Sequence, residues 1–392
     1  MDKPRETKKT SRRTFLNRSI ATAVAVGAAG TLGSRAAAQA PRAPRSGPQP
    51  VVDLAGEKVV QISMVVKDVQ KVAKRFSEVW GASWKLYDLK PTEVILHDKE
   101  LPDGSCSLKL AIGNLGGRSF KLVQPVSGQS SYMEFLQKQG EGFYSFSVGT
   151  LANHDKAVAD LKKAGVVIEM QGGLGNDAKF TVLETVDDLG VRVELASASM
   201  KAGETNLKPA GSIVATGHSV INMERPINSG GKRFTQLGII VKDDKRAAAR
   251  FEELFGIRGS GWRFYPIPVL ADYDTYVNEK LVAKADIPSL NVDCASAVLG
   301  DIQLELLRPI GMKPGGCHQA FFDKHGPGFQ HLNLGPRSSD YHITMDALKK
   351  AGFHPEFVCP RGEDGSSEVT YVAMEEQLGG MVLEFGGKKV ED

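Results

Sequence analysis

Two glutamates, Glu305 and Glu384, stand where a strand pattern would bury them. Each lies between two large apolar residues, in the sequences Leu-Glu-Leu and Leu-Glu-Phe. Side chains alternate along a strand, so each carboxylate points to the face opposite its apolar neighbours. If that face is enclosed, an unpaired carboxylate costs several kcal/mol unless a cation meets it. One divalent metal ion can neutralise both groups.

Gln236 and His331 occur in similar strand patterns. Gln236 begins the apolar run Gln-Leu-Gly-Ile-Ile-Val, and His331 lies in Gly-Phe-Gln-His-Leu-Asn-Leu at 328–334. Taken alone, each polar residue has an ordinary explanation: the histidine could be satisfied in a core, and Glu305 could pair with Arg308. An imidazole and oxygen donors that occur together in strand patterns favour a metal site over those separate explanations.

The surrounding sequence predicts a regular order of elements, in which a strand, a helix and three strands occur twice in the C-terminal half. The expected helices lie at 316–325 and 339–351, and the expected strands at 234–242, 262–266, 289–299, 301–308, 328–334, 353–358, 368–375 and 381–386. Repeated βαβββ units are an α+β arrangement. The mixed sheet curls, helices cover its outer face, and the concave face can hold a ligand.

The N-terminal half contains the same series of patterns. Lys-Gln-Gly-Glu-Gly-Phe at 138–143 matches Lys-His-Gly-Pro-Gly-Phe at 324–329, and Leu-Lys-Lys-Ala-Gly occurs at both 161–165 and 348–352. Repetition over so long a period predicts two related domains.

Together with Leu-Glu-Leu-Leu-Arg-Pro at 304–309 and Gly-Gly-Met-Val-Leu-Glu-Phe at 379–385, these runs resemble the vicinal-oxygen-chelate superfamily of glyoxalase I and methylmalonyl-CoA epimerase. The resemblance covers both halves. It implies four βαβββ modules that form two glyoxalase/bleomycin-resistance-type domains with curved mixed sheets. We therefore expect an N-terminal domain over 57–198, a linker over 199–232 and a C-terminal domain over 233–390.

The resemblance also implies a metal site in the C-terminal domain. Four strands each supply one ligand in the family, and the matching positions are Gln236, Glu305, His331 and Glu384. One imidazole with three oxygen donors suits Zn, Ni, Co or Mn, with positions left open for substrate.

The N-terminal copy departs from this pattern, because the same positions hold Gln61, Lys121, Ser145 and Glu194. A protonated lysine cannot ligate a metal, and serine replaces imidazole poorly. We expect a degenerate site in which Lys121 neutralises Glu194. Family members differ in whether modules pair within a half or exchange between halves. The intact set forms here only if the third and fourth modules pair with each other.

A bound divalent ion can chelate two neighbouring substrate oxygens and stabilise the enediolate left by loss of an α-proton. The resemblance assigns the base to Glu384 or Glu305, and Glu384 is favoured because the last-strand glutamate commonly has this role. We expect a lyase, isomerase or epimerase of a small carbonyl or oxyacid substrate. A non-catalytic binding protein is the alternative. An extradiol-type dioxygenase is less favoured, since iron there needs two histidines and only His331 occupies a ligand position.

The first forty residues resemble a twin-arginine signal peptide. Ser-Arg-Arg-Thr-Phe-Leu at 11–16 precedes a weakly apolar run at 19–33 and Ala-Gln-Ala at 38–40. We expect a signal over 1–40 that is read by the twin-arginine export machinery, then a flexible tether over 41–56. The protein would be periplasmic or secreted, without stable membrane insertion.

The net charge of +3 belongs to this leader. Residues 1–40 hold eight basic and two acidic residues, which leaves 41 basic and 44 acidic residues in the remainder. The remainder therefore gives no electrostatic reason to expect a nucleic-acid partner. The four cysteines form no Cys-rich zinc pattern, and we expect them to be buried or singly paired.

Overall fold

The structure is a computed structural model. It describes residues 49–174, 178–197, 207–215, 217–221, 223, 232–257, 261–267, 275–282, 292–310, 316–335, 341–361, 367–374 and 377–388. The expected signal over 1–40 lies outside the described residues, so the export motif stays a prediction.

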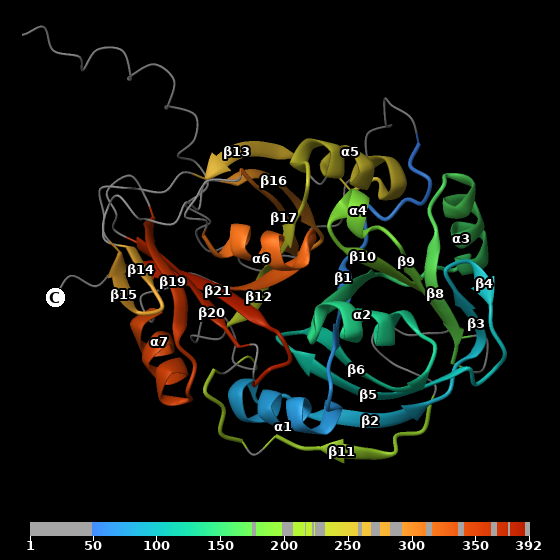
Figure 1. Cartoon of the computed structure of the whole chain (residues 1–392), viewed down its shortest axis with the longest axis horizontal. Helices are drawn as coiled ribbons and strands as arrows, with labels where there is room; N and C mark the ends of the chain where they lie inside the picture. The colour runs from blue at the N-terminus through green and yellow to red at the C-terminus, as the bar shows by residue number, and fades with distance from the viewer. Residues whose placement is uncertain are drawn as a thin grey trace, which may run out of the picture. The chain divides into compact units, whose positions relative to one another are not determined.

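The N-terminal half forms one curled sheet of eleven strands (Figure 1). The strands are β1 Val59–Val65, β2 Trp84–Leu89, β3 Thr92–Leu96, β4 Lys99–Glu100, β5 Cys106–Leu115, β6 Arg118–Gly128, β7 Gly142–Val148, β8 Ile168–Gly173, β9 Lys179–Leu183, β10 Arg192–Ala196 and β11 Gly211–Ile213. Their order in the sheet is β11-β2-β5-β6-β1-β7-β10-β9-β8-β3-β4. The first strands of its two modules, β1 and β7, pair antiparallel at the centre.

The C-terminal half repeats this arrangement in a sheet of ten strands. They are β12 Arg233–Ile240, β13 Arg263–Ile267, β14 Thr275–Val277, β15 Lys280–Val282, β16 Val292–Leu299, β17 Ile302–Pro309, β18 Gly328–Gly335, β19 Pro355–Arg361, β20 Ser367–Ala373 and β21 Val382–Lys388. The order is β13-β16-β17-β12-β18-β21-β20-β19-β14-β15. The third and fourth modules therefore share one sheet, which is the pairing that the intact ligand set requires. The β14–β15 hairpin was not predicted.

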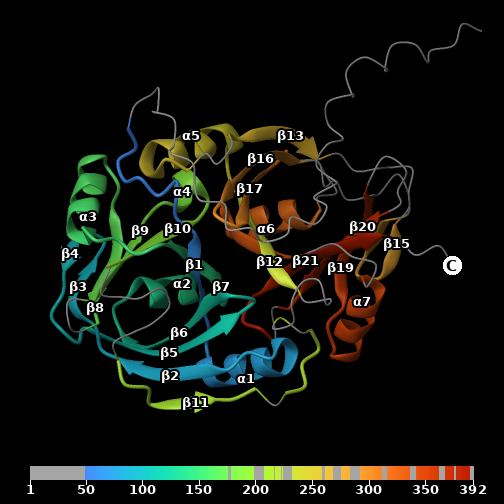
Figure 2. The same cartoon turned by 180° about the vertical axis from the view of Figure 1, so that it is seen from behind.

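Helices lie on both sides of each curled sheet (Figures 1 and 2). They are α1 Val69–Trp80, α2 Ser131–Gln139, α3 His154–Lys163, α4 Val186–Leu189, α5 Asp244–Phe255, α6 Cys317–His325 and α7 Tyr341–Lys350. The helices α1, α3, α5 and α7 cover the outer faces, whereas α2 and α6 lie inside the curve of their sheets. No helix formed by the described residues is both long and apolar enough to cross a lipid bilayer.

The two halves begin with the same local construction. The Asp68 carboxylate accepts hydrogen bonds from backbone N–H groups in the first turn of α1, and the Asp243 carboxylate does the same for α5. Each helix ends at a glycine in the left-handed conformation, with φ of 74° at Gly81 and 63° at Gly256. Aspartate accepts hydrogen bonds from otherwise unbonded N–H groups, and glycine adopts positive φ without strain, so both ends follow from residue type.

The segments that connect the domains are more ordered than the sequence indicated. The backbone N–H groups of Val51, Val52 and Leu54 bond the last carbonyl groups of α5, and Leu54 is fully buried. Residues 49–56 of the expected tether therefore lie against the second half of the chain. Part of the expected linker also joins a domain, since β11 extends the N-terminal sheet beside β2. Apolar residues and unpaired strand edges in these segments find partners that local sequence does not reveal.

The halves are joined through a shared core. The rings of Phe143 and Phe329 stack with their centroids 4.4 Å apart. The Arg75 guanidinium on α1 bonds the Ala351 carbonyl and the Gln377 side chain, both from the other half. The stacked rings come from equivalent positions of the two halves, and the Arg75 contacts add hydrogen bonds between the halves.

Candidate metal centre

The four predicted ligands come from four adjacent strands, in the order β17-β12-β18-β21. Ligand atoms of Glu305, His331 and Glu384 lie within 4.8 Å of one another. His331 Nε2 is 2.9 Å from Glu384 Oε2 and 3.9 Å from Glu305 Oε2. The Gln236 amide joins the group by donating a hydrogen bond to Glu305 Oε2. The structure therefore brings together all four residues that the sequence singled out.

These groups are removed from water. His331 is 0% exposed, Glu384 is 3% exposed and Glu305 is 8% exposed. One imidazole can carry at most one positive charge, which cannot balance two buried carboxylates. Burying an unbalanced charge costs several kcal/mol after relaxation. A divalent cation at this point would remove the imbalance.

Gly238 on β12 makes room for the His331 ring. It is the strand neighbour of both Glu305 and His331. A Cβ atom at Gly238 would lie 1.9 Å from His331 Cε1 and 2.2 Å from Nε2, closer than atoms can approach. The imidazole therefore lies directly over the glycine, in a space that any larger residue would fill.

The Nε2 atom of His331 is buried and makes no hydrogen bond, although Glu384 Oε2 is nearby. A buried ring nitrogen without a hydrogen bond is uncommon and needs an explanation. An imidazole nitrogen beside two carboxylates and an amide is a donor set that divalent transition metals accept. The unbonded Nε2 atom and the donor groups around it therefore fit a metal ion.

In the N-terminal half, a lysine neutralises the buried carboxylate at the equivalent place. Ser63 pairs with Lys121 and Ser145, as Gly238 pairs with Glu305 and His331. The buried Lys121 ammonium lies 2.6 and 2.8 Å from the two carboxylate oxygens of Glu194. Ser145 Oγ also donates to that carboxylate, at 3.2 Å. The ammonium thus stands where a cation is needed, as the sequence suggested.

The rest of that concave face is filled. A buried cluster that includes Tyr87, Tyr132, Tyr144 and Phe180 packs inside the N-terminal sheet. Clusters at the corresponding places of the C-terminal sheet are smaller among the described residues. Among the described residues, the interior of the N-terminal sheet is therefore more completely filled by side chains than that of the C-terminal sheet.

Sequence reasoning did not identify Gln330 and Tyr371, which surround His331 together with His318. Gln330 Oε1 lies 3.0 Å from His331 Nδ1 and 2.7 Å from His318 Nδ1. The Tyr371 ring packs edge-on against both imidazoles, with centroids 5.4 and 5.1 Å away. The position of His318 at the start of the short helix was the signal available in the sequence. Nothing local marked Gln330 or Tyr371.

Arg308 does not pair with Glu305, which was the ordinary explanation for that glutamate. Its guanidinium instead bonds Asp293 and lies 3.4 Å from Asp244. Glu305 and Arg308 are three residues apart on β17, so their side chains point to opposite faces of the sheet. Glu305 instead lies beside Gln236 and His331.

The Glu305 carboxylate also influences two neighbouring groups. Burial raises the pKa of the Cys294 thiol, and the negative charge of Glu305 raises it further. The same causes, in the same order, raise the pKa of the Tyr265 phenol. Both groups therefore stay protonated and neutral beside the site.

All four cysteines are buried, and none forms a disulfide. Of the remaining histidines, His354 pairs with Glu279 at an exposed position, and His342 contacts the Tyr341 ring. Among the described residues, the group of converging ligand atoms contains Glu305, His331 and Glu384, and neither of these two histidines belongs to it.

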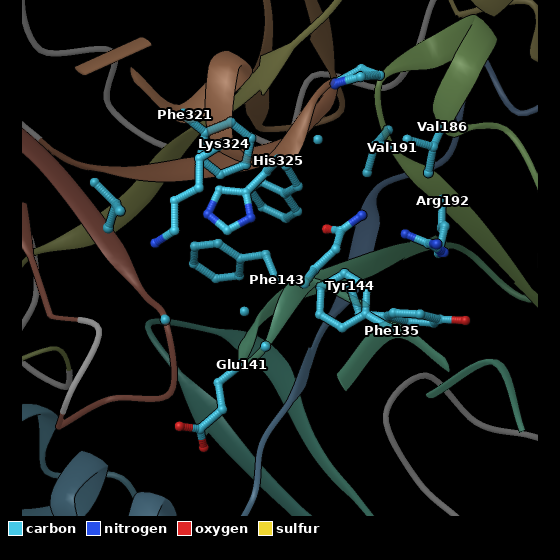
Figure 3. Close-up of a pocket in the computed structure, with 18 of the residues that line it drawn as sticks. Phe135, Glu141, Phe143, Tyr144, Val186, Val191, Arg192, Phe321, Lys324 and His325 are labelled. Atoms are coloured by element: carbon cyan, nitrogen blue, oxygen red, sulfur yellow. The ribbon is translucent and has the colours of Figure 1, made fainter. Parts of the chain in front are cut away.

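A pocket of about 430 Å³ lies at the junction of the two halves. Figure 3 shows Phe143, Lys324 and His325 on one side of it, and Tyr144, Phe135 and Arg192 on the other. None of the four predicted ligands lines this pocket. A second pocket, of about 420 Å³, reaches Cys317 and Gln330 behind His331. The pocket at the junction is therefore separate from the metal centre.

Comparisons with known proteins agree with this fold. Residues 235–371 match the family described as the Glyoxalase/Bleomycin resistance protein/Dioxygenase superfamily. A comparison with curated proteins gives no significant match.

Among solved structures, a triple mutant of 4-hydroxymandelate synthase from Streptomyces coelicolor is similar over 86% of this chain and 94% of its own, with a TM-score of 0.50 and 13% identity. A Mn(II)-bound glyoxalase from Novosphingobium aromaticivorans covers 84% of this chain and 83% of its own, with a TM-score of 0.40 and 13% identity. At 13% identity, the similarity to the synthase concerns the fold alone. Residues 235–371 in the C-terminal half thus match the Glyoxalase/Bleomycin resistance protein/Dioxygenase superfamily, and the described chain has a fold similar to that of the synthase.

Proposed function

We propose that Gln236, Glu305, His331 and Glu384 hold a divalent metal ion, and that the C-terminal domain is a metal-dependent lyase, isomerase or epimerase. The superfamily includes metal-dependent glyoxalases, epimerases and dioxygenases. The observation that carries the proposal is the convergence of two buried carboxylates on the Nε2 atom of one buried imidazole. The oxygen-rich donor set favours Zn, Ni, Co or Mn.

When bound, the ion would supply Lewis-acid stabilisation of negative charge on a substrate oxygen. The chain itself would supply the base that removes an α-proton from a small carbonyl or oxyacid substrate. Glu305 Oε2 already accepts a hydrogen bond from Gln236. That contact, and the family resemblance, favour Glu384 as the base. Burial keeps water from competing for the proton.

A dioxygenase of the extradiol type is less well supported. It would need a second histidine beside His331 and a carboxylate. His318 is near, but its Nδ1 atom bonds Gln330 and it does not belong to the group of converging ligand atoms. Non-catalytic binding of a small molecule remains the alternative that the experiments below distinguish.

Metal analysis tests the proposal most simply. We expect one divalent ion per chain in the purified full-length protein, measured by elemental analysis and by titration calorimetry. His331→Ala and Glu384→Gln should each weaken metal affinity by at least about 100-fold. Removing a residue that only orients a ligand typically lowers metal affinity by about 10–100-fold, and removing the ligand itself should lower it at least as much. The double variant Lys121→Met/Glu194→Gln changes the equivalent pair in the other half and should leave stoichiometry unchanged. Wild-type protein that takes up no metal would refute the site.

Gly238→Ala tests the space for the imidazole. Alanine in a strand is otherwise favoured over glycine by roughly 0.5–1 kcal/mol. At this position its Cβ would overlap the His331 ring, so we expect metal affinity to fall by about 100-fold or more even if the protein stays folded. Gly211→Ala, whose Cβ would have its nearest neighbour at 3.7 Å, is the matched control. Equal metal affinity in the two variants would contradict the assigned ring position.

Proton exchange tests the reaction class. Small α-hydroxy and α-oxo carbonyl compounds can be screened by NMR in deuterated water with the metal-loaded protein. We expect α-proton exchange for at least one compound, and a fall of about 10²–10⁴-fold in its rate for Glu384→Gln, the usual contribution of a general base. Compounds that bind without exchange would favour the binding protein instead.

We also propose export through the twin-arginine machinery, supported by the motif at 11–16. Arg12→Lys/Arg13→Lys keeps the charge but removes the motif. We expect the variant to accumulate uncleaved in the cytoplasm, whereas the wild type is recovered outside it with a new N-terminus near residue 41. Cell fractionation with N-terminal mass determination distinguishes them, and an unchanged distribution would argue against this route.

A further inference from the structure

Gln330 occupies a β-bulge beside the metal centre. On β12 the consecutive residues Gly238 and Ile239 pair with His331 and Phe329 on β18. The strand β18 therefore has one more residue than β12 between these two pairs. Gln330 is the additional residue. A bulge changes the direction of a side chain relative to regular alternation. As a result, Gln330 and His331 contact each other although they are consecutive.

The orientation of the Gln330 amide is fixed by its other contact. Its Nε2 group donates to the Cys317 carbonyl oxygen at 3.3 Å, which turns Oε1 toward the rings of His318 and His331. Exchanging the two ends of the amide would set its oxygen against the Cys317 oxygen, and neither can donate. The glutamine and both histidines are at least 97% buried, so water does not offer an alternative partner.

An amide oxygen only accepts hydrogen bonds, so the Nδ1 atoms of His318 and His331 must both carry hydrogen. A neutral imidazole protonated at Nδ1 has its lone pair on Nε2. In His331 that is the atom facing Glu384 and Glu305, at 2.9 and 3.9 Å. The ring is thereby prepared for a metal before any metal is present.

We infer that Gln330 is a positioning residue, which holds His331 as the Nδ1–H tautomer and aims its Nε2 lone pair at the carboxylates. Its use depends on the proposed metal site, but the tautomer is a property of the metal-free chain. The hydrogen bond from His318 to Gln330 also connects the first turn of α6 to β18. The Tyr371 ring packs against both imidazole rings.

The N-terminal half shows the same bulge with different chemistry. Ser63 and Met64 pair with Ser145 and Phe143, so Tyr144 is the additional residue there. Its hydroxyl donates to Ser131 Oγ at 2.6 Å, in α2. This bulge orders a helix against a strand but has no imidazole to orient. It provides a matched control position.

Histidine-labelled, metal-free full-length protein tests the inference by ¹H–¹⁵N NMR, which reports the nitrogen that carries the proton. We expect His331 to be protonated at Nδ1 when neutral. Gln330→Leu should shift the tautomer toward Nε2–H and weaken metal affinity by about 10–100-fold, as for other residues that orient a ligand. Gln330→Glu keeps an acceptor for both rings and should retain the tautomer. Tyr144→Phe should change neither measurement.

Detection of the Nε2–H tautomer in the metal-free wild type would overturn the inference without reference to any variant. So would unchanged metal affinity in Gln330→Leu. If the wild type shows the Nδ1–H tautomer but binds no metal, the inference stands and the proposed metal function fails. The two claims are therefore separable.

Discussion

A carboxylate buried inside a curled sheet needs a positive charge beside it, and this requirement organises both halves of the molecule. In the N-terminal half the charge is built into the chain, because the Lys121 ammonium contacts both oxygens of Glu194. In the C-terminal half Glu305 takes the position of the lysine, so the site holds two carboxylates and only one imidazole. The same fold thus neutralises Glu194 with a lysine in one half, and in the other half it leaves the charges of Glu305 and Glu384 for an ion.

A small set of replacements separates a structural domain from a metal centre. Where the N-terminal half has Ser63, the C-terminal half has Gly238, and only the glycine leaves space for a ring on the adjacent strand. Serine at 145 is small enough to sit opposite Ser63. The histidine and the glycine therefore depend on each other, and neither change alone would produce the C-terminal arrangement.

The internal repeat predicted the modules, and strand alternation indicated that Glu305 and Glu384 are buried. The family resemblance supplied the set of four converging residues, and the pairing of the third and fourth modules followed from that set. Alternation failed at Gln330, which the bulge directs toward His331 instead of away from it. It also could not anticipate that Leu54 docks on α5, or that β14 pairs with β19, since those contacts are made by residues far apart in the sequence. Tertiary contacts, and not local preference, fixed these features.

The central claim is that a single ion balances the charges of Glu305 and Glu384. Crystals of the full chain grown with Mn or Zn, and measured at the absorption edge of the metal, test it directly. The account predicts one anomalous peak, at bonding distance from His331 Nε2 and from both carboxylates, with none beside Lys121. A peak elsewhere, or a water-filled cluster in crystals saturated with metal, would contradict it.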